Sequence, residues 1–205
     1  MENRTCAMKE IVVATTNKGK VAEIALALAN LPVKVLDLSD FGDIPEAVED
    51  GDSFMANAQL KAKHYAHHTG KACLADDSGL EVDALGGAPG IYSARFAGED
   101  ANDAANNQKL LAELTGVVPE KRTARFRCVL ALADIDGTIM TADGVREGII
   151  GQDLRGLGGF GYDPLFYMPE MEKTMAECSK SEKNDISHRG QALKIMTKML
   201  GEYLK

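Results

Sequence analysis

Polar side chains that could bind an anion stand together in the segment TTNKGK at residues 15–20. Thr15 offers a hydroxyl group, Asn17 an amide and Lys20 an ammonium group. An apolar run precedes the segment, so we expect a strand to give way to a helix here. Because the free N–H groups at the start of a helix favour an anion, the segment could bind phosphate.

A Walker phosphate loop needs Gly, four residues and then Gly-Lys-Ser/Thr, and this segment departs from it at two positions. Ala14 stands in place of the first glycine, and Val21 stands in place of the residue whose hydroxyl holds the metal. Taken alone, the segment favours an ordinary capped turn over a phosphate site. The same departures argue against a phosphotransfer enzyme built on a Walker-like loop.

Two adjacent aspartates, Asp76 and Asp77, follow the apolar run at residues 72–75 and precede Ser-Gly. We expect them at a strand end, which is where α/β sheets bind ligands. A carboxylate there can bind Mg²⁺ or accept a proton from water. An Asx-type turn explains the pair equally well, and the residues themselves do not rank one aspartate above the other.

A second acidic pair, Glu49 and Asp50, lies in a loop before the helix expected at residues 53–68. That helix places Asn57 and Lys61 four residues apart and therefore on one face. Carboxylates followed by an amide and an amine would suit a metal–phosphate site. Taken alone, they favour a solvated loop and helix.

A glycine-dense loop, GLGGFGYDPLF at residues 156–166, combines aromatic rings with a carboxylate. Phe160 and Tyr162 offer flat faces for a nucleotide base, and Asp163 offers an acceptor for its N–H groups. Glycines let the backbone come close to a ligand. The alternative is a tight loop with the Phe160 ring packed inward.

Three cations, Lys183, His188 and Arg189, are expected at the N-terminus of the last helix. Cations there oppose the helix dipole, so they indicate something anionic or polar nearby. Another pair, His64 and His68, has the spacing of a metal pair, but no third ligand lies within sequence reach. We expect those two histidines at the surface.

Periodicity and cap residues place these side chains on expected elements. The expected strands cover residues 11–14, 33–38, 72–75, 124–134, 138–142 and 145–150. The expected helices cover residues 18–30, 53–68, 103–114 and 187–203, with Ser53, Asp103 and Ser187 as caps. This order predicts an α/β protein with a mixed sheet. Because no Pro/Gly/Ser-rich linker interrupts it, we expect residues 1–205 to form a single domain.

Composition narrows the classes of function. The chain has 205 residues and a net charge of −8 without a basic run, which argues against a nucleic-acid polymer as partner. No apolar run is long enough to span a membrane, and residues 1–8 lack a signal-peptide core, so we expect a loose N-terminal extension. The four dispersed cysteines suit a reducing, cytoplasmic setting.

The segments together resemble one family. The pieces, in chain order, are TTNKGK, EDGDSF with NAQLKA, LADDSGLEVDALGGAPGIYSARFAGEDA, GGFGYDPLF and SEKNDISHRGQAL. They resemble the inosine triphosphate pyrophosphatase family, the bacterial-type enzymes that hydrolyse dITP, ITP and XTP. The resemblance implies two lobes around a long mixed, twisted β-sheet, a deep active-site cleft and a homodimer. It also implies Mg²⁺-dependent hydrolysis of an NTP to an NMP and pyrophosphate.

The resemblance also assigns roles. Asp77 would accept the proton from water, and Glu49 and Asp77 would bind the metal. The substrate-binding residues would be Thr15, Thr16, Asn17, Lys18, Gly19, Lys20, Lys61, Ser78, Phe160, Gly161, Tyr162, Asp163, Lys183, His188 and Arg189. One departure is Ala56, where the family often has Glu, so no third acid is assigned there. A nucleotide sensor without catalysis is the alternative, and the retained carboxylates argue against it.

Overall fold

The computed structural model describes residues 8–205, so residues 1–7 of the expected N-terminal extension lie outside the described part. Met8 is exposed and precedes the first strand. The strands are β1 (Lys9–Val13), β2 (Val33–Asp37), β3 (Ala72–Val82), β4 (Thr123–Ala133), β5 (Ile139–Ile150), β6 (Phe166–Met168) and β7 (Lys173–Thr174). The α-helices are α1 (Lys18–Leu28), α2 (Phe54–Thr69), α3 (Asp103–Glu113), α4 (Lys180–Ile186) and α5 (His188–Tyr203).

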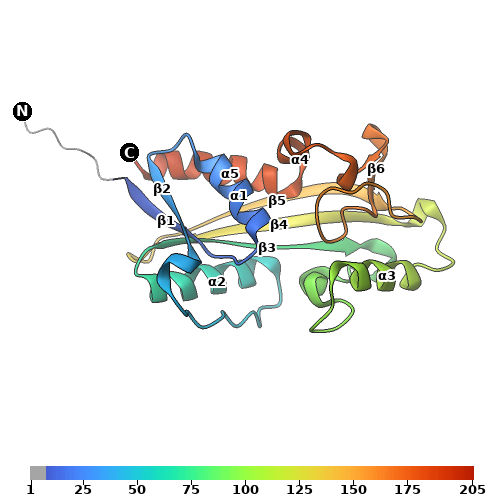
Figure 1. The fold of residues 1–205 in the computed structure, drawn as a ribbon, viewed down its shortest axis with the longest axis horizontal. Coiled ribbons are helices and arrows are strands. Elements are labelled where there is room, and N and C mark those ends of the chain that lie inside the picture. The colour runs from blue at the N-terminus through green and yellow to red at the C-terminus, as the bar shows by residue number, and fades with distance from the viewer. Residues whose placement is uncertain (1–7) are drawn as a thin grey trace, which may run out of the picture. The chain divides into compact units, whose positions relative to one another are not determined.

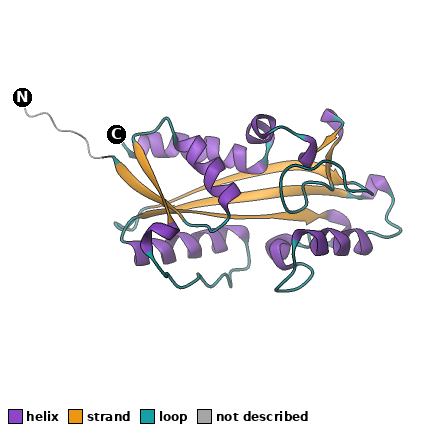
Figure 2. Ribbon diagram, viewed as in Figure 1, coloured by secondary structure: helices purple, strands orange, loops and turns teal. Residues whose placement is uncertain are grey.

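The seven strands form one sheet in the order β2-β1-β3-β4-β5-β6-β7. Strand β1 runs parallel to β2 and β3, whereas β6 runs antiparallel to β5 and β7. The expected α/β class with a mixed sheet is confirmed. The longest strands are β3, β4 and β5, with 11, 11 and 12 residues (Figure 2).

The described chain forms two compact units. Unit 1 contains the chain up to Asp76 together with Leu130–Ala142 and Leu193–Lys205, and unit 2 contains Asp77–Val129 and Asp143–Ala192. The chain passes from one unit to the other inside β3, β4, β5 and α5 rather than in a loop. This explains why no linker composition marks the division in the sequence.

Unit 1 begins with parallel strands joined by helices. The β1 residues Ile11, Val12 and Val13 have no solvent exposure, as expected for a strand covered on both faces. Helices α1 and α2 lie on opposite sides of these strands (Figure 1). Since β2 and β3 flank β1 on either side, the strand order reverses at the carboxyl end of β1. That is where open α/β sheets bind ligands.

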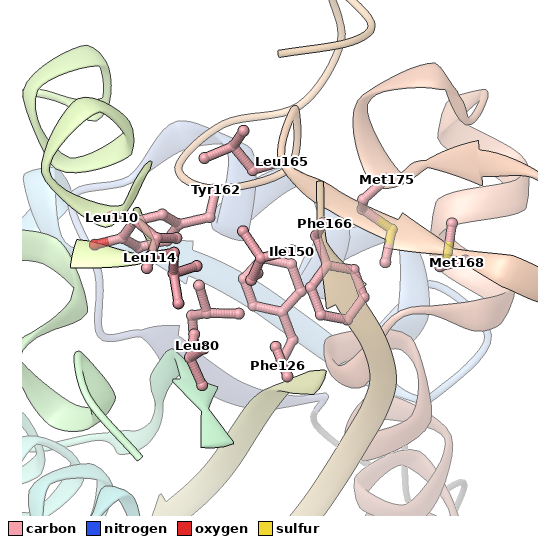
Figure 3. Packing of buried hydrophobic residues seen from close by; sticks show 12 residues of the cluster. Leu80, Leu110, Leu114, Phe126, Ile150, Tyr162, Leu165, Phe166, Met168 and Met175 are labelled. Atoms are coloured by element: carbon pink, nitrogen blue, oxygen red, sulfur yellow. The ribbon is translucent and has the colours of Figure 1, made fainter. Parts of the chain in front are cut away.

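Unit 2 has a hydrophobic cluster built from helix, strand and loop residues (Figure 3). Leu110 and Leu114 reach it from the α3 region, and Phe126 reaches it from β4. The Phe126 and Phe166 rings lie 4.4 Å apart between centroids. This cluster supports the loop that carries Tyr162, which is itself one of its members.

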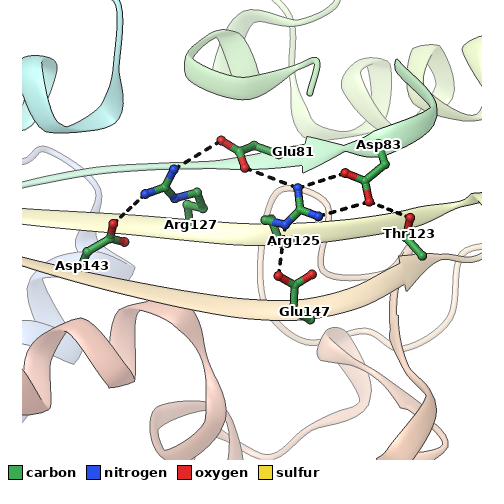
Figure 4. Close-up of polar contacts among 7 residues, drawn as sticks. All are labelled: Glu81, Asp83, Thr123, Arg125, Arg127, Asp143 and Glu147. Atoms are coloured by element: carbon green, nitrogen blue, oxygen red, sulfur yellow. Dashed lines mark hydrogen bonds and ion pairs between the residues drawn. The ribbon is translucent and has the colours of Figure 1, made fainter. Parts of the chain in front are cut away.

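On β4, charged residues alternate with the buried Phe126 and Cys128 and so lie on the other face. Arg125 Nη1 is 3.0 Å from Asp83 Oδ1, and Arg127 Nη2 is 2.6 Å from an Asp143 oxygen (Figure 4). Hydrogen bonds from Thr123 and Arg125 hold the pKa of Asp83 below its ordinary value. Glu81 and Glu147 complete this cross-strand network.

The expected strand end before Asp76 is wrong. Strand β3 continues through Asp76 and Asp77 to Val82, because β4 neighbours it in the sheet and supplies hydrogen-bond partners where β1 has ended. The two aspartates therefore lie within a strand, where successive side chains point to opposite faces.

Other expectations also need correction. The strands expected at residues 138–142 and 145–150 form one continuous strand, β5. Helix α3 is capped by Asn102 rather than by Asp103. Helix α4 and strands β6 and β7 were not expected, because two to seven residues carry too little periodicity to be seen.

Candidate functional site

The segment at residues 15–20 forms the start of α1 in unit 1, as the sequence predicts. Asn17 caps the helix, and its Oδ1 atom accepts the N–H groups of Gly19 (2.9 Å) and Lys20 (3.2 Å). The hydroxyl oxygen of Thr15 accepts the N–H of Asn17 at 3.2 Å. These oxygens accept N–H groups of the turn, so the side-chain donors that remain for a phosphate include the Asn17 Nδ2 group, the Thr15 hydroxyl proton and the Lys20 ammonium group.

Lys20 reaches from α1 to Asp76 on β3 and forms an ion pair with it. The register explains this contact, since Val13 pairs with Leu74 and Asp76 lies two residues further along β3. The Asp76 side chain is fully buried, while the Lys20 side chain keeps 18% of its surface exposed. A buried carboxylate thus holds a cation at the carboxyl end of β1.

Lys61 and Glu49 also meet within unit 1. The Lys61 ammonium group lies 2.9 Å from Glu49 Oε2, on α2 and in the preceding loop respectively. The loop is held in place by Asn57, whose Oδ1 atom accepts the N–H of Gly51 at 2.8 Å. The expected face that Asn57 and Lys61 share is therefore turned toward the acidic loop.

Asp77 and Ser78 begin unit 2. Asp77 is buried, and Ser78 accepts a 3.4 Å hydrogen bond from Arg189 Nη2. Arg189 stands at the start of α5 and is 1% exposed. The structure thus joins two expected substrate-binding residues that are far apart in the sequence.

The Phe160 ring lies beside two cations in unit 2. The Lys183 ammonium group is 4.4 Å from the ring centroid, and the Arg189 guanidinium carbon is 5.6 Å from it. Lys183 also forms a buried ion pair with Asp163, whose Oδ2 atom accepts the Phe160 N–H at 2.9 Å. Burial raises the pKa of the Asp163 carboxyl, and the Lys183 charge opposes that shift. Aromatic face, donors and acceptor are therefore assembled in one place.

Lys183 lies in the last turn of α4, not at a helix N-terminus as expected. His188 does begin α5, and its ring stacks on Phe126 with centroids 4.8 Å apart. Gly144 of β5 lets the backbone of α5 come close to the strand. A Cβ atom at Gly144 would lie 2.6 Å from the Ala192 nitrogen and closer still to the His188 carbonyl. The sheet therefore sets the position of the first turn of α5.

Tyr162 is buried in the hydrophobic cluster, and its hydroxyl donates to the Ser93 carbonyl at 2.8 Å. Burial, followed by the nearby Asp103 charge, raises its pKa well above the ordinary range. The substrate contact assigned to Tyr162 from the sequence stays a prediction. Its neighbour Gly161 lies nearer the surface.

Comparisons with known proteins match nearly the whole chain. The Ham1 family model matches residues 11–199. This chain belongs to the Ham1 family. It is 56% identical over 185 residues to the dITP/XTP pyrophosphatase of Desulforamulus reducens, covering 90% of this chain and 92% of that protein. The resemblance to a family of non-standard purine triphosphate pyrophosphatases is thereby confirmed.

Solved Ham1 structures share the fold. A HAM1 protein from Coxiella burnetii is 45% identical with a TM-score of 0.88, covering 95% of this chain and all of that one. The Ham1 protein of Staphylococcus aureus is 40% identical with a TM-score of 0.86 and the same coverage.

The two metal ligands expected from the sequence carry the kind of group that Mg²⁺ prefers. Glu49 and Asp77 are carboxylates, and Mg²⁺ is commonly held by one or two carboxylates together with substrate phosphates. Among residues 8–205, no three His, Cys, Asp or Glu side chains gather closely enough to hold a metal ion. His64 Nε2 lies 2.7 Å from the Pro45 carbonyl oxygen, and His68 is exposed.

Sequence reasoning did not identify two residues of the Ham1 chain that contact the loop carrying Phe160. Asp103 and Asn107 of α3 both hydrogen-bond the backbone of Gly161, the residue after Phe160. The one available signal was their spacing of four, which continues the apolar face of α3 at Leu110 and Leu114.

Proposed function

We propose that this chain hydrolyses dITP, ITP and XTP to the nucleoside monophosphate and pyrophosphate in a Mg²⁺-dependent reaction, and so removes them from the nucleotide pool. The relative from Desulforamulus reducens is named a dITP/XTP pyrophosphatase and is 56% identical to this chain over 185 residues. The chemistry of the two groups of side chains supports the same reaction.

The observation that carries the proposal is the Phe160 ring beside Lys183, Arg189 and Asp163. A purine base needs a flat apolar face together with donors and acceptors for its edge, and these residues supply both. Stacking of a base on an aromatic ring contributes about 1–3 kcal/mol. Gly161, Tyr162 and Asp163 would complete the surroundings of the base.

Selectivity for 6-oxo purines over adenine would follow from a hydrogen-bond donor on one of the basic side chains. A donor aimed at O6 is satisfied by hypoxanthine or xanthine, whereas the 6-amino group of adenine would leave it without an acceptor. We assign this donor to His188 or Arg189, both buried at the start of α5. Ser78, which Arg189 contacts, would touch the substrate beside them.

The phosphates would be bound by the first turn of α1 and by α2. The proposed ligands are Thr15, Thr16, Asn17, Lys18, Gly19, Lys20 and Lys61. Helix α1 contains no acidic residue in its described first turn, so the helix dipole and Lys18 both favour an anion. Because Lys20 and Lys61 pair with carboxylates, they are fixed in position before they meet a phosphate.

Asp77 would accept the proton of the water that attacks the α-phosphorus, as its buried carboxylate allows. We propose Glu49 and Asp77 as Mg²⁺ ligands. When bound, the metal would neutralise phosphate oxygens and make water more acidic. No covalent intermediate is required, since positioning and charge stabilisation dominate such reactions.

We also propose a homodimer in the cytoplasm, with residues 1–205 acting as one functional domain. The match of one family model across both units supports the last point. No described helix is long and apolar enough to cross a membrane. Light scattering after size exclusion would test the dimer.

One assay tests the function. The protein is incubated with ITP, dITP, XTP, GTP and ATP, with Mg²⁺ and with EDTA, and pyrophosphate is measured against orthophosphate. Pyrophosphate from the first three substrates, lost with EDTA, is the expected result. Orthophosphate as the product would overturn the proposal, and binding without turnover would indicate a sensor.

A further inference from the structure

Two side chains of α3 hold the backbone of Gly161. Asp103 Oδ2 accepts the Gly161 N–H at 2.7 Å, and Asn107 Nδ2 donates to the Gly161 carbonyl at 2.8 Å. Both polar backbone groups of one residue are thus bound by one helix. Gly161 has a φ of +61°, a conformation that other residues rarely adopt.

These bonds fix the peptide groups around Phe160. The N–H of Gly161 belongs to the peptide that joins it to Phe160, and its carbonyl belongs to the next one. The Phe160 N–H is in turn held by Asp163. Three successive peptide groups are therefore hydrogen-bonded to side chains, which restricts the direction in which the Phe160 side chain leaves the backbone.

Helix α3 is a rigid base for this contact. Asp103, Asn107, Leu110 and Leu114 follow spacings of four, three and four, so they share one side of the helix. The two leucines have no solvent exposure and belong to the hydrophobic cluster (Figure 3). Asn107 is itself buried, so its amide is held by packing as well as by hydrogen bonds.

Asn106, the neighbour of Asn107 on the same helix, makes different contacts. Asn106 is as buried as Asn107, but its amide bonds the Ala94 carbonyl at 3.0 Å and the Ala97 N–H at 2.8 Å. It ties α3 to the preceding segment, because these hydrogen bonds end on Ala94 and Ala97 and not on the Phe160 loop. The two asparagines thus offer a matched comparison.

We infer that Asp103 and Asn107 are positioning residues, which set the Phe160 ring for the base of the substrate without touching the substrate. The inference rests on the proposed role of Phe160 in base stacking. Loss of either side chain releases one of the two polar backbone groups of Gly161, so the ring is no longer held in the plane that the base requires. Phosphate binding by unit 1 residues does not depend on α3.

The first experiment is kinetic. Asp103→Ala and Asn107→Ala are expected to raise KM for dITP about tenfold, the loss of one stacking contact, with a smaller change in kcat. Asp103→Asn keeps an acceptor oxygen for the Gly161 N–H and is expected to restore most of the affinity. The inhibition constant of inorganic tripolyphosphate, which has no base, is expected to stay unchanged.

Asn106→Ala is the control for lost stability. It removes a buried amide from the same helix, so its Tm is expected to fall as in Asn107→Ala, while KM for dITP stays within about twofold. If KM instead follows Tm across all variants, or if tripolyphosphate inhibition weakens in parallel, the positioning role is overturned.

A second readout does not depend on turnover. The chain has no tryptophan, so Phe160→Trp introduces a single reporter at the ring position. Adding Asp103→Ala or Asn107→Ala is expected to increase acrylamide quenching of that tryptophan, and adding Asn106→Ala is not. Equal quenching in all three would contradict the inference.

Phe160→Ala separates the two proposals. If it leaves KM for dITP unchanged, stacking on Phe160 is wrong, and the tryptophan quenching alone decides whether α3 holds the ring. If it raises KM while Asp103→Ala and Asn107→Ala do not, the positioning inference fails and the proposed function stands.

Discussion

Lys20 and Asp76 form an ion pair in which the carboxylate side chain is fully buried and the lysine reaches it from the start of α1. Removal of one partner from a buried pair leaves the other charge poorly compensated. Lys20→Met is therefore expected to lower the free energy of unfolding by about 3 kcal/mol, measured by urea denaturation without nucleotide.

Lys18→Met is the matched control, since Lys18 is exposed on the same helix turn. Its stability is expected to stay close to that of the native chain. Lys20→Met combined with Asp76→Asn is expected to recover part of the loss. Equal stability of Lys20→Met and the native chain would show that the pair has no structural role.

Asp77→Asn tests the proposed proton acceptor. The amide keeps the shape of the buried side chain but binds a proton poorly, so kcat for dITP is expected to fall by about 10²-fold or more. Circular dichroism and Tm are expected to stay near native values. Near-native turnover in the folded variant would remove Asp77 from this role.

Arg189→Lys tests whether Arg189 helps to discriminate between hypoxanthine and adenine. The charge is retained, but the planar guanidinium that lies near Phe160 and Ser78 is lost. The ratio of kcat/KM for ITP to that for ATP is expected to fall about tenfold, with tripolyphosphate inhibition unchanged. An unchanged ratio would assign the O6 donor elsewhere, with His188 as the next residue to test.

Gly144→Ala tests the packing of α5 on β5. The added methyl group would overlap the His188 carbonyl and the Ala192 nitrogen, at a cost of about 1–3 kcal/mol in unfolding free energy. KM for dITP is expected to rise because His188 and Arg189 shift. Gly151→Ala is the control, since a methyl group there makes only ordinary contact.

The lowered pKa of Glu182 predicts that its contribution to the stability of α4 is lost in acid. Hydrogen bonds from Ser179 and then Lys173 lower its pKa from 4.5 to about 2. A carboxyl with a lowered pKa stabilises the fold above its unfolded pKa and loses that effect as pH falls toward its folded pKa. The Tm difference between the native chain and Glu182→Gln is thus expected to be constant above pH 4.5 and to shrink toward pH 2. A difference independent of pH would contradict this.

The local sequence pattern was sufficient to predict those parts of the candidate site that lie along a single helix or strand. The strand-to-helix turn at residues 15–20 and the Ser53 cap were predictable, because hydrophobic runs and cap residues are short-range signals. The pair Asp76 and Asp77 was recognised after an apolar run for the same reason, but its position inside a strand was not predicted. That error arose because the partner strand β4 lies far along the chain.

Contacts between distant segments were not predictable. Asn107 and Gly161 are separated by 54 positions, and nothing in either local pattern indicates that they meet. The boundaries of the two units could not be predicted from composition, because the chain changes unit inside β3, β4, β5 and α5. Sequence composition marks linkers, and these crossings have none.

The discontinuous make-up of unit 1 has a consequence for synthesis. Lys9 of β1 and Tyr203 of α5 both bind Asp134, at the turn between β4 and β5, so the start, middle and end of the described chain meet in one polar cluster. The ribosome adds Tyr203 long after Lys9 and Asp134 have been made. Unit 1 therefore cannot be completed before α5 has been synthesised, and a stop codon that removes α5 would leave β1 without this partner.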